Sequence, residues 1–382
     1  MAAREGRSPE VADILRSYAP EFECLGTDRR RAVRDITRCR TAALGGHLYE
    51  CDECGREVPL YNSCRNRHCP KCQSLDQARW VERQMRNLLP VRYFHVVFTV
   101  PACLQPLFVR DRRQSYALLF AAVWETLSAV CRRRLGATPG VIAVLHTWSQ
   151  TLVFHPHIHC IVTGGGVGSD GQHWISSRPD YLVPVRVLSR VFRGKLLQAL
   201  EHSLTAAHRD HGAALLRQAA AQPWVVYGKA PMAGPQQVLH YLGRYTHRIA
   251  IGNERIVSIA DERVSFRYRD RRHGNRRRVL TVTGPEFVRR FLLHVLPKHF
   301  VRLRHYGLFA NAYRSARVAQ ARVSLGAPLS PQPPQGPAEC WQELYRRLTG
   351  RDPERCPVCA RGTLRIVAVF APACPVRSGR GP

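Results

Sequence analysis

An apolar stretch of the chain, TLVFHPHIHCIV at residues 151–162, carries histidines at alternating positions. A period of two is typical of a β-strand, in which successive side chains point to opposite faces. His157 and His159 therefore share one face of a predicted strand, roughly 6.6 Å apart along the chain. That spacing allows both imidazoles to bind one metal ion. Pro156 cannot donate to a strand ladder, so we expect His155 at the start of the strand and outside the ligand set.

A neighbouring strand offers a third ligand. The segment VIAVLHTW, at residues 141–148, is apolar and contains His146. If the two segments form an antiparallel hairpin, His146 falls opposite His157 and shares its face. Gln150 and His247 remain alternatives for this position. Three imidazoles would leave open coordination positions, which a metal needs in order to polarise a substrate oxygen. The competing interpretation is a set of hydrogen-bonded core histidines.

The region between residues 39 and 72 is rich in metal ligands. The motifs CDEC and CPKC predict one tetrahedral zinc site, because two such pairs provide four thiolates. Its predicted ligands are Cys51, Cys54, Cys69 and Cys72. Four more residues of this region could form a second, interleaved zinc site: Cys39, His47, Cys64 and His68. In the alternative interpretation, the two cysteines are small buried residues and the two histidines contact phosphate. The late pair Cys356 and Cys359 has no evident partner pair nearby and is expected to form only a knuckle in the C-terminal tail.

The charge balance predicts a polyanionic partner. The chain has 58 Lys and Arg against 28 Asp and Glu, which gives a net charge of +30. Nucleic acid is favoured over a membrane surface, since no basic helix with a clean apolar face is evident. The first ten residues lack the apolar core of a signal peptide, and no run approaches the ~20 apolar residues that would span a bilayer. We therefore expect a cytoplasmic, nucleoid-associated protein, in which cysteines bind metal rather than form disulfides.

The remaining pattern mixes predicted strands and helices, which indicates an α+β chain. We expect strands at 92–101, 141–148 and 152–163, a hairpin over 255–270 that turns at Asp261 and Glu262, and helices at 113–135, 184–212 and 283–297. The Pro-rich segment SPQPPQGP is a predicted linker. Three domains follow: a zinc-binding domain with an N-terminal helix at 1–90, a central domain at 91–325, and a linker with a basic tail at 326–382.

A predicted helix from about residue 235 carries the motif YLGRYTHR. Tyr241 and Tyr245 are four residues apart, so their phenols lie on one helical face. A tyrosine beside a metal-polarised phosphate can attack phosphorus and hold the 5′ end of a DNA strand covalently. The alternative is that the two rings simply belong to the core. Arg244 and Arg248 in the same motif favour a nearby phosphate.

These motifs together resemble the HUH endonuclease superfamily, and specifically the two-tyrosine rolling-circle transposases of the insertion-sequence ninety-one type. HPHIHC is similar to their metal motif, YLGRYTHR to their tyrosine helix, and the cysteine-rich region to their zinc-binding domain. The block FVRRFLLHVLPKHFVRLRHYGLFAN is also similar. The small histidine-triad nucleotide hydrolases share the His-x-His-x-His pattern, but Pro156, the cysteine-rich region and the basic charge argue against them.

The resemblance implies a ferredoxin-like palm whose central antiparallel strands carry the histidines. It implies nicking of single-stranded DNA at transposon ends through a 5′-phosphotyrosine, with Mg²⁺ or Mn²⁺ as the catalytic ion and Zn²⁺ as a structural ion. His157 and His159 would be metal ligands, and Tyr241 and Tyr245 nucleophiles. His146 as the third ligand rests on hairpin geometry. No helicase motif is present, so host replication or helicase factors are expected partners.

Basic side chains are expected to contact the DNA backbone. Those near the second cysteine pair and in the hairpin are the main candidates, although a solvated charged strand is the alternative for the hairpin. Besides Arg244 and Arg248, they are Arg65, Arg67, Lys71, Arg267, Arg269, Arg271 and Arg272. Two other functions remain open from sequence: a rolling-circle plasmid replication initiator or relaxase, and a non-catalytic zinc-dependent DNA-binding regulator.

Overall fold

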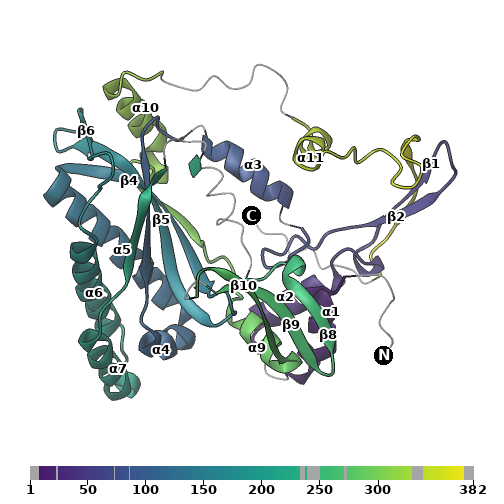
Figure 1. Cartoon of the computed structure of the whole chain (residues 1–382), viewed down its shortest axis with the longest axis horizontal. Coiled ribbons are helices and arrows are strands. Elements are labelled where there is room, and N and C mark those ends of the chain that lie inside the picture. The colour runs from purple at the N-terminus through teal and green to yellow at the C-terminus, as the bar shows by residue number, and fades with distance from the viewer. Residues whose placement is uncertain are drawn as a thin grey trace. The chain divides into compact units, whose positions relative to one another are not determined.

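The computed structural model describes residues 8–22, 25–72, 74–85, 87–232, 237–238, 250–270, 273–328 and 339–373. The chain divides into two compact units that are interleaved along the sequence. The first unit comprises Met1–Ala78, Ile249–Val295 and Pro334–Pro382, and the second comprises Arg79–Arg248 and Leu296–Pro333. Figure 1 colours the ribbon by residue number. Antiparallel sheets occur in both units, so the α+β class predicted from the sequence is confirmed.

A six-stranded antiparallel sheet forms the centre of the second unit. Its strand order is β11-β4-β5-β3-β7, and β6 pairs with β5. The strands are β3 (Tyr93–Thr99), β4 (Ala137–Trp148), β5 (Phe154–Gly168), β6 (Trp174–Ser176), β7 (Val226–Met232) and β11 (Leu303–Gly307). The described helices of this unit include α4 (Gln105–Arg110), α5 (Arg112–Leu135), α6 (Val185–His202), α7 (Arg209–Ala221) and α10 (Arg314–Ser324). The longest strands, β4 and β5, thus lie in the interior of the sheet.

The helices α5, α6 and α7 cover one face of this sheet (Figure 1). Phe98 on β3 packs edge-on against Phe192 on α6, with ring centroids 5.0 Å apart. Phe192 packs in turn against Trp224, which precedes β7. Phe98 and Phe192 are fully buried. Burial of such large aromatic side chains is the main source of stability for a sheet of this kind.

The opposite face carries a second core. Ile142 on β4 and Ile161 on β5 are directly paired in the ladder and belong to a buried cluster with Tyr93 on β3. Val318 on α10 and Val238, one of two described residues of a helical segment, are buried in the same cluster. Because residues of a strand alternate in direction, this is the face of β4 that carries His146. The core therefore lies directly beside the histidine positions.

The first unit contains two three-stranded antiparallel sheets, with orders β12-β1-β2 and β10-β9-β8. The strands are β1 (Gly46–Cys51), β2 (Glu57–Tyr61), β8 (Ile256–Ala260), β9 (Arg263–Asp270), β10 (Arg276–Thr283) and β12 (Leu364–Phe370). The helices are α1 (Val11–Tyr18), α2 (Thr27–Arg38), α9 (Gly284–Leu293) and α11 (Trp341–Thr349). A further helix, α3 (Ser74–Met85), spans the boundary between the two units in the sequence.

The hairpin predicted over 255–270 is present as β8 and β9. Asp261 and Glu262 connect the strands, and both have positive φ angles, of 49° and 57°. A type I′ turn requires positive φ angles at both central residues, and its twist matches that of a hairpin. The structure adds β10 as a third strand.

The helix predicted after Thr283 is also confirmed as α9, because the Thr283 hydroxyl accepts a hydrogen bond from the Glu286 N–H at its start.

The predicted domain boundaries differ from the observed units. Residues 249–295, which we placed in the central domain, pack with the N-terminal helices instead. The physical reason is a shared core: α1 packs on α9, and the Val11 N–H donates to the Asn253 side chain over 3.1 Å. Tyr18 lies so close to Gly284 that a β-carbon there would come within 2.4 Å of its ring. The tail also joins this unit, since β12 pairs with β1.

The single helix predicted over 184–212 is wrong. The structure has two helices, α6 and α7, separated by a turn at residues 203–208. The Ser203 hydroxyl donates to the Leu200 carbonyl over 2.6 Å and ends the first helix. Gly212, the predicted end of that helix, lies inside α7, where a β-carbon would approach the Leu204 side chain to 2.6 Å. This glycine permits close packing and does not terminate the helix.

Candidate functional site

Three imidazoles converge on β4 and β5. His146 pairs directly with His157 in the β4–β5 ladder, which is the register that the predicted hairpin requires. A tight turn at Ser149 connects the strands, and its N–H donates to the Val153 carbonyl over 3.0 Å. One ring nitrogen from each of His146, His157 and His159 lies within 4.8 Å of the others. The structure therefore brings the three predicted ligands together, whereas His155 is not part of this group.

The second ring nitrogens of two of these histidines have partners. His157 Nδ1 lies 2.6 Å from the His155 carbonyl oxygen. His159 Nδ1 lies 2.9 Å from Nε2 of His95, a buried residue of β3. Histidines that bind metals commonly hold one ring nitrogen in such a hydrogen bond, which orients the other toward the ion. The arrangement fits a divalent metal on the remaining nitrogens.

His95 is a site residue that the sequence interpretation missed. It lies in RYFHVVFTV, whose pattern predicts only a buried strand. A histidine inside an apolar strand was the available signal, because an unpartnered imidazole is costly to bury. His155 is also largely enclosed, and burial lowers its pKa. The His95 ring lies 5.1 Å from that of His159, and the His155 ring lies 5.1 Å from that of His157.

A first group of four thiols lies at the end of α2 and in the loop before α3. Its members are Cys39, Cys64, Cys69 and Cys72, all with sulfurs within 4.8 Å of one another. The Cys64 and Cys72 sulfurs are 3.7 Å apart. Four thiolates around tetrahedral zinc, each at about 2.3 Å, lie about 3.8 Å apart, whereas a disulfide requires about 2.05 Å. Asn66 and Lys71 donate backbone N–H groups to Cys64 and Cys69, each over 3.4 Å.

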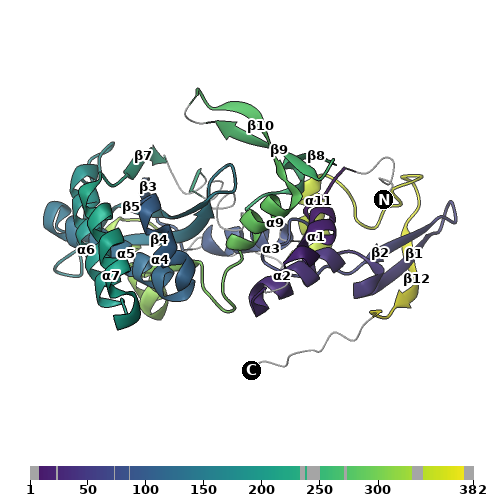
Figure 2. The same ribbon diagram turned by 90° about the horizontal axis from the view of Figure 1, so that it is seen from below.

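A second group combines distant parts of the sequence. Cys51 and Cys54, at the turn between β1 and β2, lie with Cys356 and Cys359, which precede β12. The Cys51 sulfur is 3.7 Å from that of Cys359, and the Cys54 sulfur is 3.9 Å from that of Cys356. Figure 2 shows β12 in yellow alongside β1 and β2. These four thiols also match the spacing of a tetrahedral zinc site.

These two groups correct the predicted ligand sets. The proposed site of Cys51, Cys54, Cys69 and Cys72 does not form, because its two pairs belong to different groups. The proposed second set does not form either. Cys39 and Cys64 join the CPKC pair, while His47 lies in β1 near the Tyr49 ring and His68 is not a member of either group. Pairing by sequence proximity was wrong, because β12 brings the late cysteines to the β1–β2 turn.

Neighbouring thiols perturb one another in both groups. Hydrogen bonds from Cys64, Cys69 and Cys72 lower the pKa of Cys39, and the same contact with Cys39 raises the pKa of Cys64. In the second group, the Gly362 N–H lowers the pKa of Cys359 to about 6. Although the Arg56 N–H favours the thiolate of Cys54, burial and its neighbouring thiols raise its pKa to about 12. Four adjacent thiols do not all lose their protons unless a cation offsets the negative charge. This behaviour is typical of thiolate metal sites.

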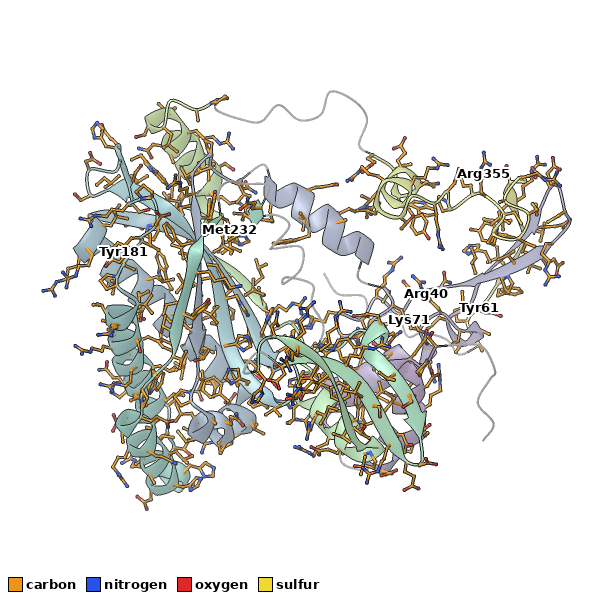
Figure 3. The ribbon with its side chains drawn as sticks, viewed as in Figure 1. Arg40, Tyr61, Lys71, Tyr181, Met232 and Arg355 are labelled. Atoms are coloured by element: carbon orange, nitrogen blue, oxygen red, sulfur yellow. The ribbon has the colours of Figure 1, made fainter. Side chains whose placement is uncertain are left out.

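The basic residues near the first thiol group differ in exposure. Arg65 is exposed, with a positive φ of 51°. Arg67 is half-buried, and burial lowers its pKa. Lys71, labelled in Figure 3, forms an ion pair with Glu10 and keeps only 11% of its side chain exposed. Of these three predicted DNA contacts, Arg65 therefore has the most accessible charge.

The β9–β10 ribbon carries the arginines predicted to track DNA. Arg267 and Arg269 are exposed on one face of β9, while Val264 and Phe266 are buried on the other. Arg269 lies directly opposite Arg277 on β10. Like charges at directly paired positions are destabilising in a sheet, so this arrangement favours an anionic ligand. Both strands extend beyond α9 (Figure 2).

Several predicted site residues lie outside the described part of the chain. They are Tyr241, Tyr245, Arg244, Arg248, Arg271 and Arg272, together with the alternative ligand His247. Val238, three residues before Tyr241, is described and is helical. It is buried on the sheet face that carries the three imidazoles. The chain therefore approaches the histidine face immediately before the tyrosine motif.

Comparison with known proteins identifies the family. A family described as "Transposase zinc-binding domain" matches residues 11–100, and one described as "Putative transposase" matches residues 140–317. A "Putative transposase y4qJ" of Sinorhizobium fredii is 46% identical over 390 aligned residues, which cover 96% of each chain. This chain belongs to the IS91-type transposases. The resemblance to transposases of this type, with an N-terminal zinc-binding domain, is therefore confirmed.

A more distant relative supports the same assignment. The transposase for insertion sequence element IS801, from Pseudomonas savastanoi pv. phaseolicola, is 26% identical over 356 residues. The alignment covers 88% of this transposase and 83% of the relative. No solved structure matches this transposase. Within the described residues, no helix of the transposase is long and apolar enough to cross a membrane.

Proposed function

We propose that this transposase nicks single-stranded DNA at transposon ends and transfers the strand by a rolling-circle route. The observation that carries this proposal is the convergence of His146, His157 and His159 on one sheet face, the face on which Val238 packs with Ile142 and Ile161. Val238, Tyr241 and Tyr245 are spaced three and four residues apart, as on one face of a helix. A helix that continues through the motif would direct both phenols toward the histidine face.

In the proposed reaction, the phenol oxygen of Tyr241 or Tyr245 attacks the phosphorus of the scissile phosphodiester. The new O–P bond forms as the bond from phosphorus to the 3′ oxygen breaks. The phenol proton passes to solvent or a nearby base, and the departing 3′ oxygen takes up a proton. The products are a 5′-phosphotyrosine and a free 3′ hydroxyl. A second tyrosine permits a second cleavage before the first intermediate is resolved.

The chain's own residues would bind and orient the catalytic ion. A divalent cation held by the three imidazoles would polarise the scissile phosphate and stabilise charge at the phosphorus. His95 would fix the ring of His159, and the His155 carbonyl that of His157. Imidazole suits transition metals better than Mg²⁺, so Mn²⁺ is the more favourable of the two expected ions. On this proposal the six-stranded sheet is the ferredoxin-like palm of an HUH endonuclease.

We propose that DNA contacts are divided between two surfaces of the first unit. The exposed arginines of the β9–β10 ribbon would follow the phosphate backbone, with Arg269 and Arg277 as neighbouring contacts. Arg65 would contribute beside the first thiol group, which would hold a structural Zn²⁺. Such contacts supply affinity without sequence information, through release of counterions. Host replication or helicase factors would supply the unwinding, in the nucleoid.

A covalent adduct tests this function. Full-length protein is incubated with labelled single-stranded oligonucleotides that carry the element's ends, with and without Mn²⁺, and is then analysed on a denaturing gel. We expect a Mn²⁺-dependent protein–DNA band that disappears in the Tyr241→Phe, Tyr245→Phe double variant. Tyr227→Phe, at an exposed tyrosine of β7, is the matched control and should retain the band. Absence of any adduct would favour the alternative function, a non-catalytic zinc-dependent DNA-binding regulator.

The metal ligands have their own test. We expect His157→Ala or His159→Ala to abolish the adduct while single-stranded DNA still binds, because the arginines remain. His173→Ala is the matched control, since this histidine is exposed and pairs with Asp170 away from the triad. Cleavage that survives either ligand change at physiological metal concentration contradicts the assignment.

A further inference from the structure

We propose that Cys51, Cys54, Cys356 and Cys359 bind a second structural Zn²⁺, which attaches the C-terminal segment to the zinc-binding domain. The matched zinc-binding domain ends at residue 100, so two of the four ligands lie more than 250 residues beyond it. This inference does not depend on the nicking reaction.

The geometry of the ligands is that of a zinc knuckle pair. The paired sulfur distances of 3.7 and 3.9 Å match the ~3.8 Å edge of a tetrahedral zinc–thiolate site. Backbone N–H groups of Val358 and Gly362 point at the sulfurs of Cys356 and Cys359, each over 3.4 Å. These bonds stabilise the thiolate form, which is the form that binds the metal. Four thiols would lose their protons as the ion binds.

The surrounding backbone is built around this group. Asp52 receives the Thr363 N–H on its carboxylate over 2.7 Å, and its own N–H donates to the Thr363 carbonyl over 3.2 Å. Immediately beyond, Cys51 pairs with Leu364 in the β1–β12 ladder. A β-carbon on Gly362 would lie 2.3 Å from the Cys51 sulfur. Only glycine allows the two knuckles to approach so closely.

The sheet that carries these knuckles has little hydrophobic core. Along β12 no residue is fully buried, and Ile366, Val367 and Val369 are 54%, 50% and 71% exposed. In β1 only the terminal residues Gly46 and Cys51 are buried. A three-stranded sheet with so little apolar burial is not stable alone, and small folds of this kind are commonly held by a metal. Zinc at the cysteine end would supply the missing stability.

Counting zinc in the full-length protein tests the proposal. We expect two zinc ions per wild-type chain and one in the Cys356→Ser, Cys359→Ser double variant. The Cys64→Ser, Cys72→Ser variant should also keep one, at the second site. Cys340→Ser is the matched control, because Cys340 is an exposed thiol of the same segment outside both groups, and should keep two. A wild-type count of one, or a Cys356/Cys359 variant that keeps two, overturns the proposal.

A measurement on wild-type protein covers the case in which variants fail to fold. Native protein is treated with an alkylating reagent, and each cysteine is followed by mass spectrometry before and after addition of a zinc chelator. We expect Cys340 to react at once, whereas Cys356 and Cys359 react at least tenfold faster once chelator is present. If these two react as fast as Cys340 without chelator, the site does not hold zinc.

A glycine substitution sharpens the assignment. Gly362→Ala would place a methyl group against the Cys51 sulfur, so we expect loss of the second zinc and retention of the first. Gly194→Ala is the control, because a β-carbon on this α6 glycine meets nothing within 4 Å. Two zinc ions in the Gly362→Ala protein would contradict the close approach on which the site depends.

Discussion

The histidine sheet of the second unit and the cysteine sheet β12-β1-β2 of the first obtain order from different sources. The histidine sheet has a hydrophobic core on each face: Phe98 packs on Phe192 of α6 on one side, and Ile142 and Ile161 pack with Val318 of α10 on the other. The cysteine sheet is largely exposed and has thiol groups where a core would be. Side-chain packing positions the histidines, whereas metal binding by the cysteines must stabilise the cysteine sheet.

Zinc removal should separate the two regions most strongly. We expect a chelator to abolish hydrogen-exchange protection in β1 and β12, while β4 and β5 keep theirs. Structural zinc contributes about 10–16 kcal/mol in small modules, and no comparable core remains without it. Peptide-resolved hydrogen exchange measures the effect. Equal loss of protection in both sheets would mean that the difference is not real.

Single truncations should show the same contrast on a smaller scale. Phe98→Ala removes a fully buried ring that packs on Phe192, so we expect a loss of about 3–5 kcal/mol in the free energy of unfolding. Val369→Ala changes a side chain that is 71% exposed in β12, and we expect less than about 0.5 kcal/mol. Denaturant unfolding of both variants measures the difference. A large cost at Val369 would reveal a core that the exposure does not indicate.

Changes behind the metal ligands should have an intermediate effect. If His95 positions His159, His95→Ala should raise the Mn²⁺ concentration needed for nicking by about 10–100-fold. Excess Mn²⁺ should then rescue activity, and His95→Gln should restore part of the affinity through its amide. Titration of activity with Mn²⁺ measures this. A loss of rate that no metal concentration rescues would indicate damage to the sheet instead.

Acid should weaken the histidine sheet through His305. Burial, and then the nearby Arg314, lowers the pKa of this β11 residue to about 4, below the usual value of 6.5. The unfolded chain binds the proton more readily, so stability is full above pH 6.5 and falls as the pH drops toward 4. We expect a loss of about 3 kcal/mol over this interval, absent in His305→Gln. Chemical denaturation at several pH values compares the two proteins, and identical profiles would contradict this role.

The smallest expected effect on stability lies in the β9–β10 ribbon. Arg269→Ala relieves repulsion with Arg277, so we expect a gain of about 0.2–1 kcal/mol. Affinity for single-stranded DNA should fall for all sequences, and the slope of log affinity against log salt should decrease by about 1. Binding titrations at several salt concentrations measure both. An unchanged salt slope would place the DNA elsewhere.

Local patterns predicted that the three histidines would lie together. Alternation in HPHIHC and the apolar strand containing His146 were sufficient to predict their convergence, because hairpin register follows from a short connection. The helix after Thr283 was predicted because its capping residue directly precedes it in the sequence. His95 was not predicted, because it lies on a strand that pairs with β5 from its other side. The sequence near His95 does not indicate that β3 pairs with β5.

The predicted cysteine ligand sets were wrong because cysteines that lie close together in the structure are far apart in the sequence. Cys51 and Cys54 were paired with the next CxxC motif along the chain, which is the usual spacing of a zinc module. Their actual neighbours are 302 or more positions away. That contact depends on β12, whose short apolar run gives no indication of its partner. Domain boundaries failed similarly, because α1 and α9 share a core across more than 200 residues of sequence.

The pairing of β1 with β12 sets an order of events during synthesis. The ribosome makes Cys54 302 residues before Cys356. At 5–20 residues per second, the nascent chain waits about 15–60 s before the strand that completes this sheet emerges. Strands β3, β4, β5, β7 and β11 of the six-stranded sheet are all made in that interval, together with their pairing partners. The sheet closed by the chain's far end is thus the last to assemble, so a prematurely terminated product would carry a folded histidine site and an unfinished amino-terminal module.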